Sequence, residues 1–382
     1  MTFDLVMPRH VRFGSGVSTE APEGLRGVSR VLVVTGRDPG RHPRVVESLR
    51  QAGLALVHLG IGREPTVEDA RSAVRTAREE GCQGVVALGG GSVLDLGKAV
   101  AGLLANPGDP MDYLEVVGRG RPLERPALPL VAIPTTAGTG SEVTRNAVLA
   151  VPDAGVKASL RSPFLLPALA LVDPDLTVGL PPEVTASCGM DALVQLLEPF
   201  TSARANPFTD ALCREAIPRV LAALPRAFRD GSDAEARREM ALGSLFGGIA
   251  LAHGGLGAAH GLAAAIGGRF PAPHGSLCAR LIVPVIRANE RKARQVGDRR
   301  TERRYRELAA LATRNPEATV PDAVEALGTL VERLGIPRLG AWGIGEQDLE
   351  ALALAGSRAG SMKANPVPLA IEDLRLILAE AT

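Results

Sequence analysis

Two histidines and one aspartate in the second half of the chain have the side-chain types of a metal site. His260 and His274 are joined by a link rich in glycine and proline, and such a link can return one imidazole to the other, as a shared metal requires. Asp191 lies within a predicted helix, where a buried acid needs a partner. Alternatively, Asp191 is an early-helix acid that interacts with the helix dipole. A pair of histidines at this spacing is by itself weak evidence for a metal site. Together, one carboxylate and two imidazoles suit Fe²⁺ or Zn²⁺.

Two glycine-rich turns in the first half have the composition of a phosphate-binding site. In the first turn, glycines between a strand and a helix allow an anion to approach the backbone N–H groups. The second turn places hydroxyl groups at the carboxyl end of another strand, where open α/β sheets bind ligands. Tight packing turns use the same residues, so each signal alone is weak. The residues concerned are Gly89, Gly90, Gly91 and Ser92 in the first turn, and Thr135, Thr136, Thr139 and Ser141 in the second.

The first half alternates apolar runs with amphipathic segments, which predicts a parallel sheet covered by helices. The predicted strands are Val31–Thr35, Leu54–His58, Gly84–Leu88, Leu130–Pro134 and Ala168–Asp173. The predicted helices between them are Arg44–Ala52, Thr66–Glu80 and Ser92–Leu104.

After about Pro181 the strand-like runs stop and long Ala- and Leu-rich segments follow, so the second half is expected to be all helical. We therefore predict an α/β domain over residues 1–180 and an all-α domain over residues 181–382. The predicted helices are Val184–Glu198, Pro207–Arg229, Ala234–Leu256, His260–Gly268, Gly275–Asn289, Thr301–Arg314, Val320–Leu334 and Gly345–Ala359.

The composition argues against several classes of partner. The 382 residues include 43 basic and 42 acidic side chains, a balance that gives no general attraction to nucleic acid or to an anionic membrane. A basic run over residues 287–306 is interpreted as a solvated helix face and loop. The four cysteines form no CxxC pair and no signal peptide is visible, so a reduced, cytoplasmic protein is expected.

In chain order, these motifs closely resemble those of the iron-containing (group III) alcohol dehydrogenases. The resemblance covers essentially the whole chain and implies a dehydroquinate synthase-like fold, in which a Rossmann-like domain precedes a helical one. It also implies an active site in the cleft between the domains, with NAD(H) or NADP(H) and one divalent metal ion. The further segments that carry it are Arg12-Phe13-Gly14-Ser15-Gly16, Gly189-Met190-Asp191-Ala192-Leu193 and Pro273-His274-Gly275.

The resemblance also implies individual roles. Gly90, Gly91 and Ser92 would hold the pyrophosphate. Thr135, Thr136 and Leu176 would line the nucleotide and nicotinamide sites, and Asp95 and Lys157 would help to position the cofactor. Three of the family's metal ligands fall on Asp191, His260 and His274.

At two positions the chain departs from the family pattern. The fourth metal ligand, usually histidine, is Gln195, and a further family histidine falls at Ala264. A neutral amide oxygen is a poorer ligand for iron or zinc than imidazole, so the metal is expected to be weakly held or absent. Without a metal, His260 or His274 would donate a hydrogen bond or proton to the developing alkoxide. The related maleylacetate reductases are described as metal-free, which implies that the fold can reduce carbonyls without a metal.

We therefore interpret the chain as an NAD(P)H-dependent aldehyde or ketone reductase, or an alcohol dehydrogenase in the other direction. The alternatives are a metal-independent maleylacetate-type reductase, a dehydroquinate-synthase-like lyase and an inactive nucleotide-binding protein. A homodimer is expected from the resemblance, with the strand ending at Arg12-Phe13-Gly14 available for edge pairing.

NADP(H) is predicted to be preferred over NAD(H). Many NAD-using relatives have Asp after the Val-Thr of the first predicted strand, where this chain has Gly36 and then Arg37. Losing the acid removes repulsion of a 2′-phosphate, and an arginine can pair with that phosphate. Asp38 is the counter-argument, because it can take over the role of the acid.

Overall fold

The computed structural model describes residues 2–382 and divides into two compact units. The first, called here the α/β unit, consists of Val6–Thr136 and Gly140–Val178. The second, called the helical unit, consists of Gly179–Thr382, the short segment Ala137–Thr139 and the N-terminal residues up to Leu5. Part of the second glycine-rich turn thus belongs to the helical unit.

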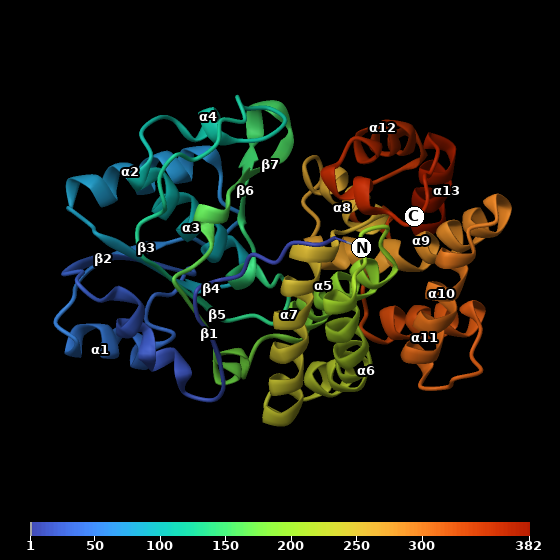
Figure 1. Ribbon diagram of the computed structural model, residues 1–382, viewed down its shortest axis with the longest axis horizontal. Coiled ribbons are helices and arrows are strands. Elements are labelled where there is room, and N and C mark those ends of the chain that lie inside the picture. The colour runs from blue at the N-terminus through green and yellow to red at the C-terminus, as the bar shows by residue number, and fades with distance from the viewer. Residues whose placement is uncertain (1) are drawn as a thin grey trace. The chain divides into compact units, whose positions relative to one another are not determined.

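The α/β unit, drawn in blue to green in Figure 1, is built on a six-stranded sheet. The strand order is β1-β8-β5-β4-β2-β3, and every pairing is parallel. The predicted parallel sheet is therefore confirmed. The strands are β1 (Val11–Phe13), β2 (Arg30–Thr35), β3 (Ala55–Gly60), β4 (Gly84–Gly89), β5 (Leu130–Pro134) and β8 (Leu169–Val172).

Alternate residues of each strand point to opposite faces of the sheet, and both faces are buried under helices. Leu32 and Val34 of β2 share a core with α2 (Val67–Glu79) and α3 (Gly91–Ala105). Val31 and Val33 pack instead with α1 (Pro43–Gln51) on the other face.

An antiparallel hairpin, β6 (Asn146–Val151) and β7 (Val156–Arg161), departs from the predicted pattern. Its turn ends at Gly155, whose φ of 61° favours glycine. Apolar residues of both hairpin strands join the core under α2 and α3. The short helix α4 (Pro110–Tyr113) was also not predicted. Single-turn and 3₁₀ segments lie at Val17–Leu25, Ser141–Val143, Pro152–Ala154, Pro163–Leu165, Pro174–Thr177, Leu339–Trp342 and Gly360–Ala364.

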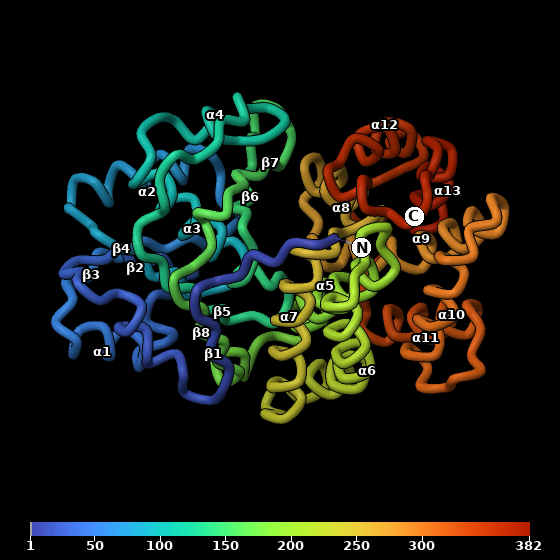
Figure 2. The backbone as a smooth tube through the Cα atoms, in the orientation of Figure 1, coloured from blue at the N-terminus to red at the C-terminus, as the bar shows by residue number. Residues whose placement is uncertain are grey.

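The helical unit confirms the predicted all-helical second half, and Figure 2 traces its helices. One helix, α13, was not predicted. Its N-cap is Ala370, which offers no side-chain oxygen, so the capping signal is incomplete. The helices are α5 (Pro182–Thr201), α6 (Pro207–Arg229), α7 (Ala234–Gly254), α8 (Ala258–Gly267), α9 (His274–Val296), α10 (Arg299–Thr313), α11 (Val320–Arg333), α12 (Glu346–Ser357) and α13 (Ile371–Ala381).

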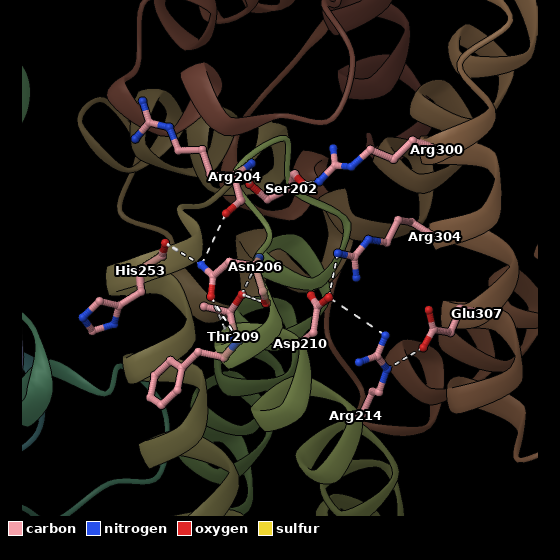
Figure 3. Close-up of polar contacts among 11 residues, drawn as sticks. Ser202, Arg204, Asn206, Thr209, Asp210, Arg214, His253, Arg300, Arg304 and Glu307 are labelled. Atoms are coloured by element: carbon pink, nitrogen blue, oxygen red, sulfur yellow. Dashed lines mark hydrogen bonds and ion pairs between the residues drawn. The ribbon is translucent and has the colours of Figure 1, made fainter. Parts of the chain in front are cut away.

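Polar side chains tie the start of α6 to its neighbours (Figure 3). Asn206 caps α6 by accepting from the N–H groups of Phe208 and Thr209, and its amide donates to the carbonyl of His253 at the end of α7. Asp210 accepts a 2.7 Å hydrogen bond from Arg304 of α10. The basic run over 287–306 lies almost entirely in α9 and α10, and five of its basic side chains form ion pairs.

Within the described residues, no single helix is both long and apolar enough to cross a bilayer. One bent helix pair, α7 with α8, meets that length and composition together.

Candidate active site

Helix α5 presents three buried polar side chains on one face. Asp191, Gln195 and Glu198 follow at intervals of four and three residues, which places them one above another on a helix. Each is at most 4% exposed. Charged groups are rarely buried to this degree without a partner, so the partners of this face define the site.

Glu198 orients the first histidine. Its carboxylate accepts hydrogen bonds from the N–H groups of Gly257 and Ala259 at the start of α8, and from Nδ1 of His260 at 2.7 Å. Because Nδ1 must carry the proton to donate to a carboxylate, Nε2 of a neutral His260 has a free lone pair. That Nε2 lies 3.4 Å from Oδ1 of Asp191. A carboxylate behind a histidine is the usual outer partner in metal sites.

The second histidine is the first residue of α9, and the glycine after it allows α9 to touch α5. A Cβ on Gly275 would lie 2.0 Å from the carbonyl oxygen of Ser187, so only glycine fits at this contact. This close approach places Nε2 of His274 at 3.9 Å from Oδ1 of Asp191. One turn further along α9, Sγ of Cys278 lies 3.7 Å from the same Nε2.

Four ligand atoms therefore converge. One atom from each of Asp191, His260, His274 and Cys278 lies within 4.8 Å of the others. Oδ1 of Asp191 and Nε2 of His260 are buried and have no hydrogen-bond partner. Two orphaned acceptors facing each other are unfavourable without a cation between them. The residues present thus fit a divalent metal ion.

The charges of this group also favour a cation. Burial by itself lowers the pKa of His260, but Cys278, Asp191 and Glu198 outweigh burial and raise this pKa. Cys278 likewise raises the pKa of His274. Burial opposes the charge of Asp191, yet the two histidines lower its pKa. The anionic groups thus stabilise positive charge, which a metal ion supplies in place of the histidine protons.

The two positions that depart from the family pattern have different environments. The amide nitrogen of Gln195 donates a 2.9 Å hydrogen bond to Oδ2 of Asp191. Its amide oxygen has no hydrogen-bond partner and lies 3.7 Å from the place a Cβ would take on Gly247 of α7. Ala264 lies one turn after His260 on α8 and is exposed.

In the α/β unit, the first glycine-rich turn lies at the point where the sheet topology switches direction. The chain leaves β2 for β3 on one side and leaves β4 for β5 on the other, and open sheets bind ligands beyond the carboxyl ends of such neighbouring strands. Thr35 is paired with Leu88, so Gly36 and Gly89 lie next to each other at the carboxyl ends of β2 and β4. Gly90 is the N-cap of α3, whose first turn presents free N–H groups to an anion.

Packing explains the glycines of this turn. A Cβ on Gly89 would lie 2.5 Å from a methyl group of Val93, and one on Gly97 would lie 2.6 Å from Cβ of Ala87. Helix α3 therefore runs close to β4. Thr135 and Thr136 follow β5, with the N–H of Thr135 bonded to the carbonyl of Gly89.

Other predicted nucleotide residues have partners inside the α/β unit. Asp95 accepts from the hydroxyl of Ser141 and from the N–H of Val148, joining α3 to the hairpin. Lys157 forms an ion pair with Glu64 at 2.6 Å. Leu176 packs against the core on the α1 side of the sheet. Thr139 lies in the segment that belongs to the helical unit.

The comparison with family models is decisive for the class of protein. Residues 8–174 match the model described as iron-containing alcohol dehydrogenase, and residues 185–382 match the C-terminal domain of the same family. The chain belongs to the iron-containing alcohol dehydrogenase family. It is an NAD(P)-dependent oxidoreductase with a metal-binding group of side chains in its helical unit.

Individual relatives are similar along the whole chain. Long-chain-alcohol dehydrogenase 1 of Geobacillus thermodenitrificans is 36% identical over 381 residues, which cover 96% of this chain and 93% of the relative. A crystal structure of 1,3-propanediol oxidoreductase superposes with a TM-score of 0.91 at 31% identity, covering 100% of both chains. Sulfoacetaldehyde reductase from Bifidobacterium kashiwanohense, in complex with NAD⁺, gives 0.85 at 28% identity, covering 100% of this chain and 99% of the other.

Sequence reasoning missed two residues of the site: Cys278, which belongs to the metal group, and Glu198, which orients His260. Glu198 was detectable in principle, because it lies seven residues after Asp191 on the same helix face. Cys278 lies one turn after His274, but a thiol there has meaning only once α5 and α8 are in place. The geometry gives no support to an impaired site, since Asp191, His260 and His274 are brought together.

Proposed function

We propose that this enzyme interconverts an alcohol and its aldehyde or ketone with a divalent metal ion held by Asp191, His260 and His274. The observation that carries the proposal is the pair of buried, unpartnered atoms, Oδ1 of Asp191 and Nε2 of His260, 3.4 Å apart. Bound Fe²⁺ or Zn²⁺ supplies a Lewis acid for the carbonyl oxygen.

The chain's own residues prepare this site. Glu198 fixes the tautomer of His260 by accepting a hydrogen bond from its Nδ1–H, so the lone pair of Nε2 faces the other metal ligands. Gln195 holds the second oxygen of Asp191, which leaves Oδ1 for the metal. The sequence-based prediction that Gln195 is itself a ligand requires its amide to turn away from Asp191. In the α/β unit, Gly90, Gly91 and Ser92 at the N-terminus of α3 bind the pyrophosphate of the nicotinamide nucleotide.

Removing the metal tests this proposal. Purified protein is treated with a chelator, and oxidation of NAD(P)H is followed with a panel of aldehydes before and after adding back Zn²⁺ or Fe²⁺. We expect activity to fall with metal content and to return with the added ion. Full activity in metal-free protein would instead place the chain with the metal-independent reductases. Metal binding without turnover of any aldehyde would favour the inactive, nucleotide-binding alternative.

We also propose that NADP(H) is preferred over NAD(H). Gly36 at the end of β2 offers no side chain, and the exposed Arg37 follows it. Oδ1 of Asp38 accepts from the N–H of Gly40 at 2.9 Å, so one oxygen of this acid is engaged within its own turn. Arg37 is thus the first charged residue after this strand along the chain.

Steady-state kinetics with both nucleotides check this preference. Replacing Arg37 by Ala is expected to lower kcat/KM for NADPH by roughly 10–100-fold, the value of about one charged hydrogen-bonded pair. The efficiency with NADH should change little, which makes it the internal control. Equal or higher efficiency with NADH in the unaltered enzyme would contradict the proposal.

We propose that the protein forms a homodimer. Strand β1 pairs with β8 on one side only and is the first strand of the sheet, so its outer edge presents unpaired backbone groups. A second copy can satisfy them by two-fold edge pairing. Light scattering at micromolar concentration is expected to give twice the mass of the chain, and a monomer mass would refute the proposal.

We propose no substrate more specific than an alcohol and its aldehyde or ketone. The relatives named above are described as acting on long-chain alcohols, 1,3-propanediol and sulfoacetaldehyde. Such different side groups on one fold mean that the substrate has to be found with an aldehyde panel rather than from family membership.

A further inference from the structure

We propose that Cys278 is the fourth protein ligand of the metal, and that its thiolate makes the site selective for Zn²⁺ over Fe²⁺. This inference rests on the proposed metal site and goes beyond it in naming the missing ligand and the preferred ion. The four ligands would be the carboxylate of Asp191, the imidazoles of His260 and His274, and the sulfur of Cys278.

The position of the sulfur supports this assignment. Cys278 is fully buried in α9, one turn after His274, and its Sγ lies 3.7 Å from Nε2 of that histidine. A tetrahedral zinc ion with bonds of about 2.0–2.3 Å holds its ligand atoms roughly 3.3–3.7 Å apart. The separations of 3.4 Å between His260 and Asp191, 3.7 Å between Cys278 and His274, and 3.9 Å between His274 and Asp191 are close to these values. Every other pair of the four ligand atoms lies within 4.8 Å.

The competing fourth ligand is Gln195, whose buried amide oxygen also has no hydrogen-bond partner. Its amide nitrogen faces Oδ2 of Asp191, because only the N–H₂ group can donate to a carboxylate. Its oxygen lies near Gly247 of α7. Gln195 would have to rotate its amide away from Asp191 to bring the oxygen to the metal. Cys278 needs no such rotation, since its sulfur already lies within 4.8 Å of all three other ligand atoms.

The chemistry of the set then determines the ion. Thiolate is a soft ligand that favours zinc, and tetrahedral sites of mixed sulfur and nitrogen ligands are typical of zinc. Iron(II) enzymes with open positions use two histidines and a carboxylate without sulfur. With four protein ligands, a substrate oxygen would be the fifth ligand, a number that catalytic zinc sites sometimes reach.

Cobalt substitution tests the proposal directly. Metal-free protein is loaded with Co²⁺, and the near-ultraviolet sulfur-to-cobalt charge-transfer band is recorded for the unaltered enzyme and for two variants. Cys278→Ser should lose this band and keep the visible cobalt bands. The matched control is Cys213→Ser, which changes another fully buried cysteine of the helical unit and should keep the band.

The outcomes separate this inference from the proposed function. Cobalt bound without a sulfur band in the unaltered enzyme would overturn Cys278 as a ligand and leave the metal proposal standing. No cobalt bound to any of the three proteins would overturn both.

Two further measurements do not depend on a spectrum of the variant. X-ray absorption of the zinc-loaded, unaltered enzyme should show one sulfur neighbour at about 2.3 Å, and its absence would contradict the proposal even if Cys278→Ser fails to fold. Where the variant folds, its Zn²⁺ affinity should fall by at least the roughly 10–100-fold that loss of an outer partner alone costs. Its preference for Zn²⁺ over Fe²⁺ should shrink as well.

Discussion

Replacing Asp191 by Asn is expected to abolish metal binding and to lower kcat/KM by about 1000-fold or more. Oδ1 of Asp191 is the atom that both histidines approach, at 3.4 and 3.9 Å. An amide of the same shape removes the negative charge that offsets the cation. Asp191 is only 3% exposed, so water screens this charge poorly. Polarisation by a metal is worth several kcal/mol of transition-state stabilisation, and each 1.4 kcal/mol or so is tenfold in rate.

Elemental analysis and steady-state kinetics on the same preparations measure this effect. The control is Glu183→Gln, which changes an exposed acid in the first turn of the same helix and should leave both metal content and rate nearly unchanged. Nucleotide binding should survive in Asp191→Asn, because the first glycine-rich turn and most of the second belong to the α/β unit. An Asp191→Asn enzyme that retains full activity would contradict the metal role of this residue.

Replacing Gly275 by Ala is expected to be the most damaging small substitution at the site. Its Cβ would lie 2.0 Å from the carbonyl oxygen of Ser187 and 3.0 Å from Cβ of Asp191, so α9 has to move away from α5. Both His274 and Cys278 move with it. Overpacking of this kind costs about 1–3 kcal/mol, and a displacement near 1 Å can lower catalysis about 100-fold.

Thermal unfolding, metal content and kcat/KM together test this prediction. Gly328→Ala in α11 is the matched control, because a Cβ there meets nothing within 4 Å. Alanine is favoured over glycine inside a helix by roughly 0.5–1 kcal/mol, so this variant should be slightly more stable and fully active. Normal metal content in Gly275→Ala would show that α9 does not need this close contact.

The sequence was informative wherever a property depends on neighbouring residues. The continuous apolar run from Val31 to Val34 predicted a buried strand, and the strand–glycine–helix order around Gly89 predicted an anion site. Repeating apolar positions predicted nearly all helices of the second half. Elements with weaker local signals were missed, such as α13, whose N-cap is alanine, and the β6–β7 hairpin, whose apolar residues are explained by packing under α2 and α3.

The composition of the metal group depended on tertiary structure. The sequence by itself identified Asp191, His260 and His274 through their motifs, and it identified Gln195 as a departure from the family. Only the fold shows that Glu198 fixes the tautomer of His260, that Gln195 directs its nitrogen at Asp191, and that Cys278 joins the group. Ligation depends on distances of a few ångströms between side chains on three different helices. Those distances are determined by how closely α5, α8 and α9 pack, as at Gly275, and local sequence patterns do not encode them.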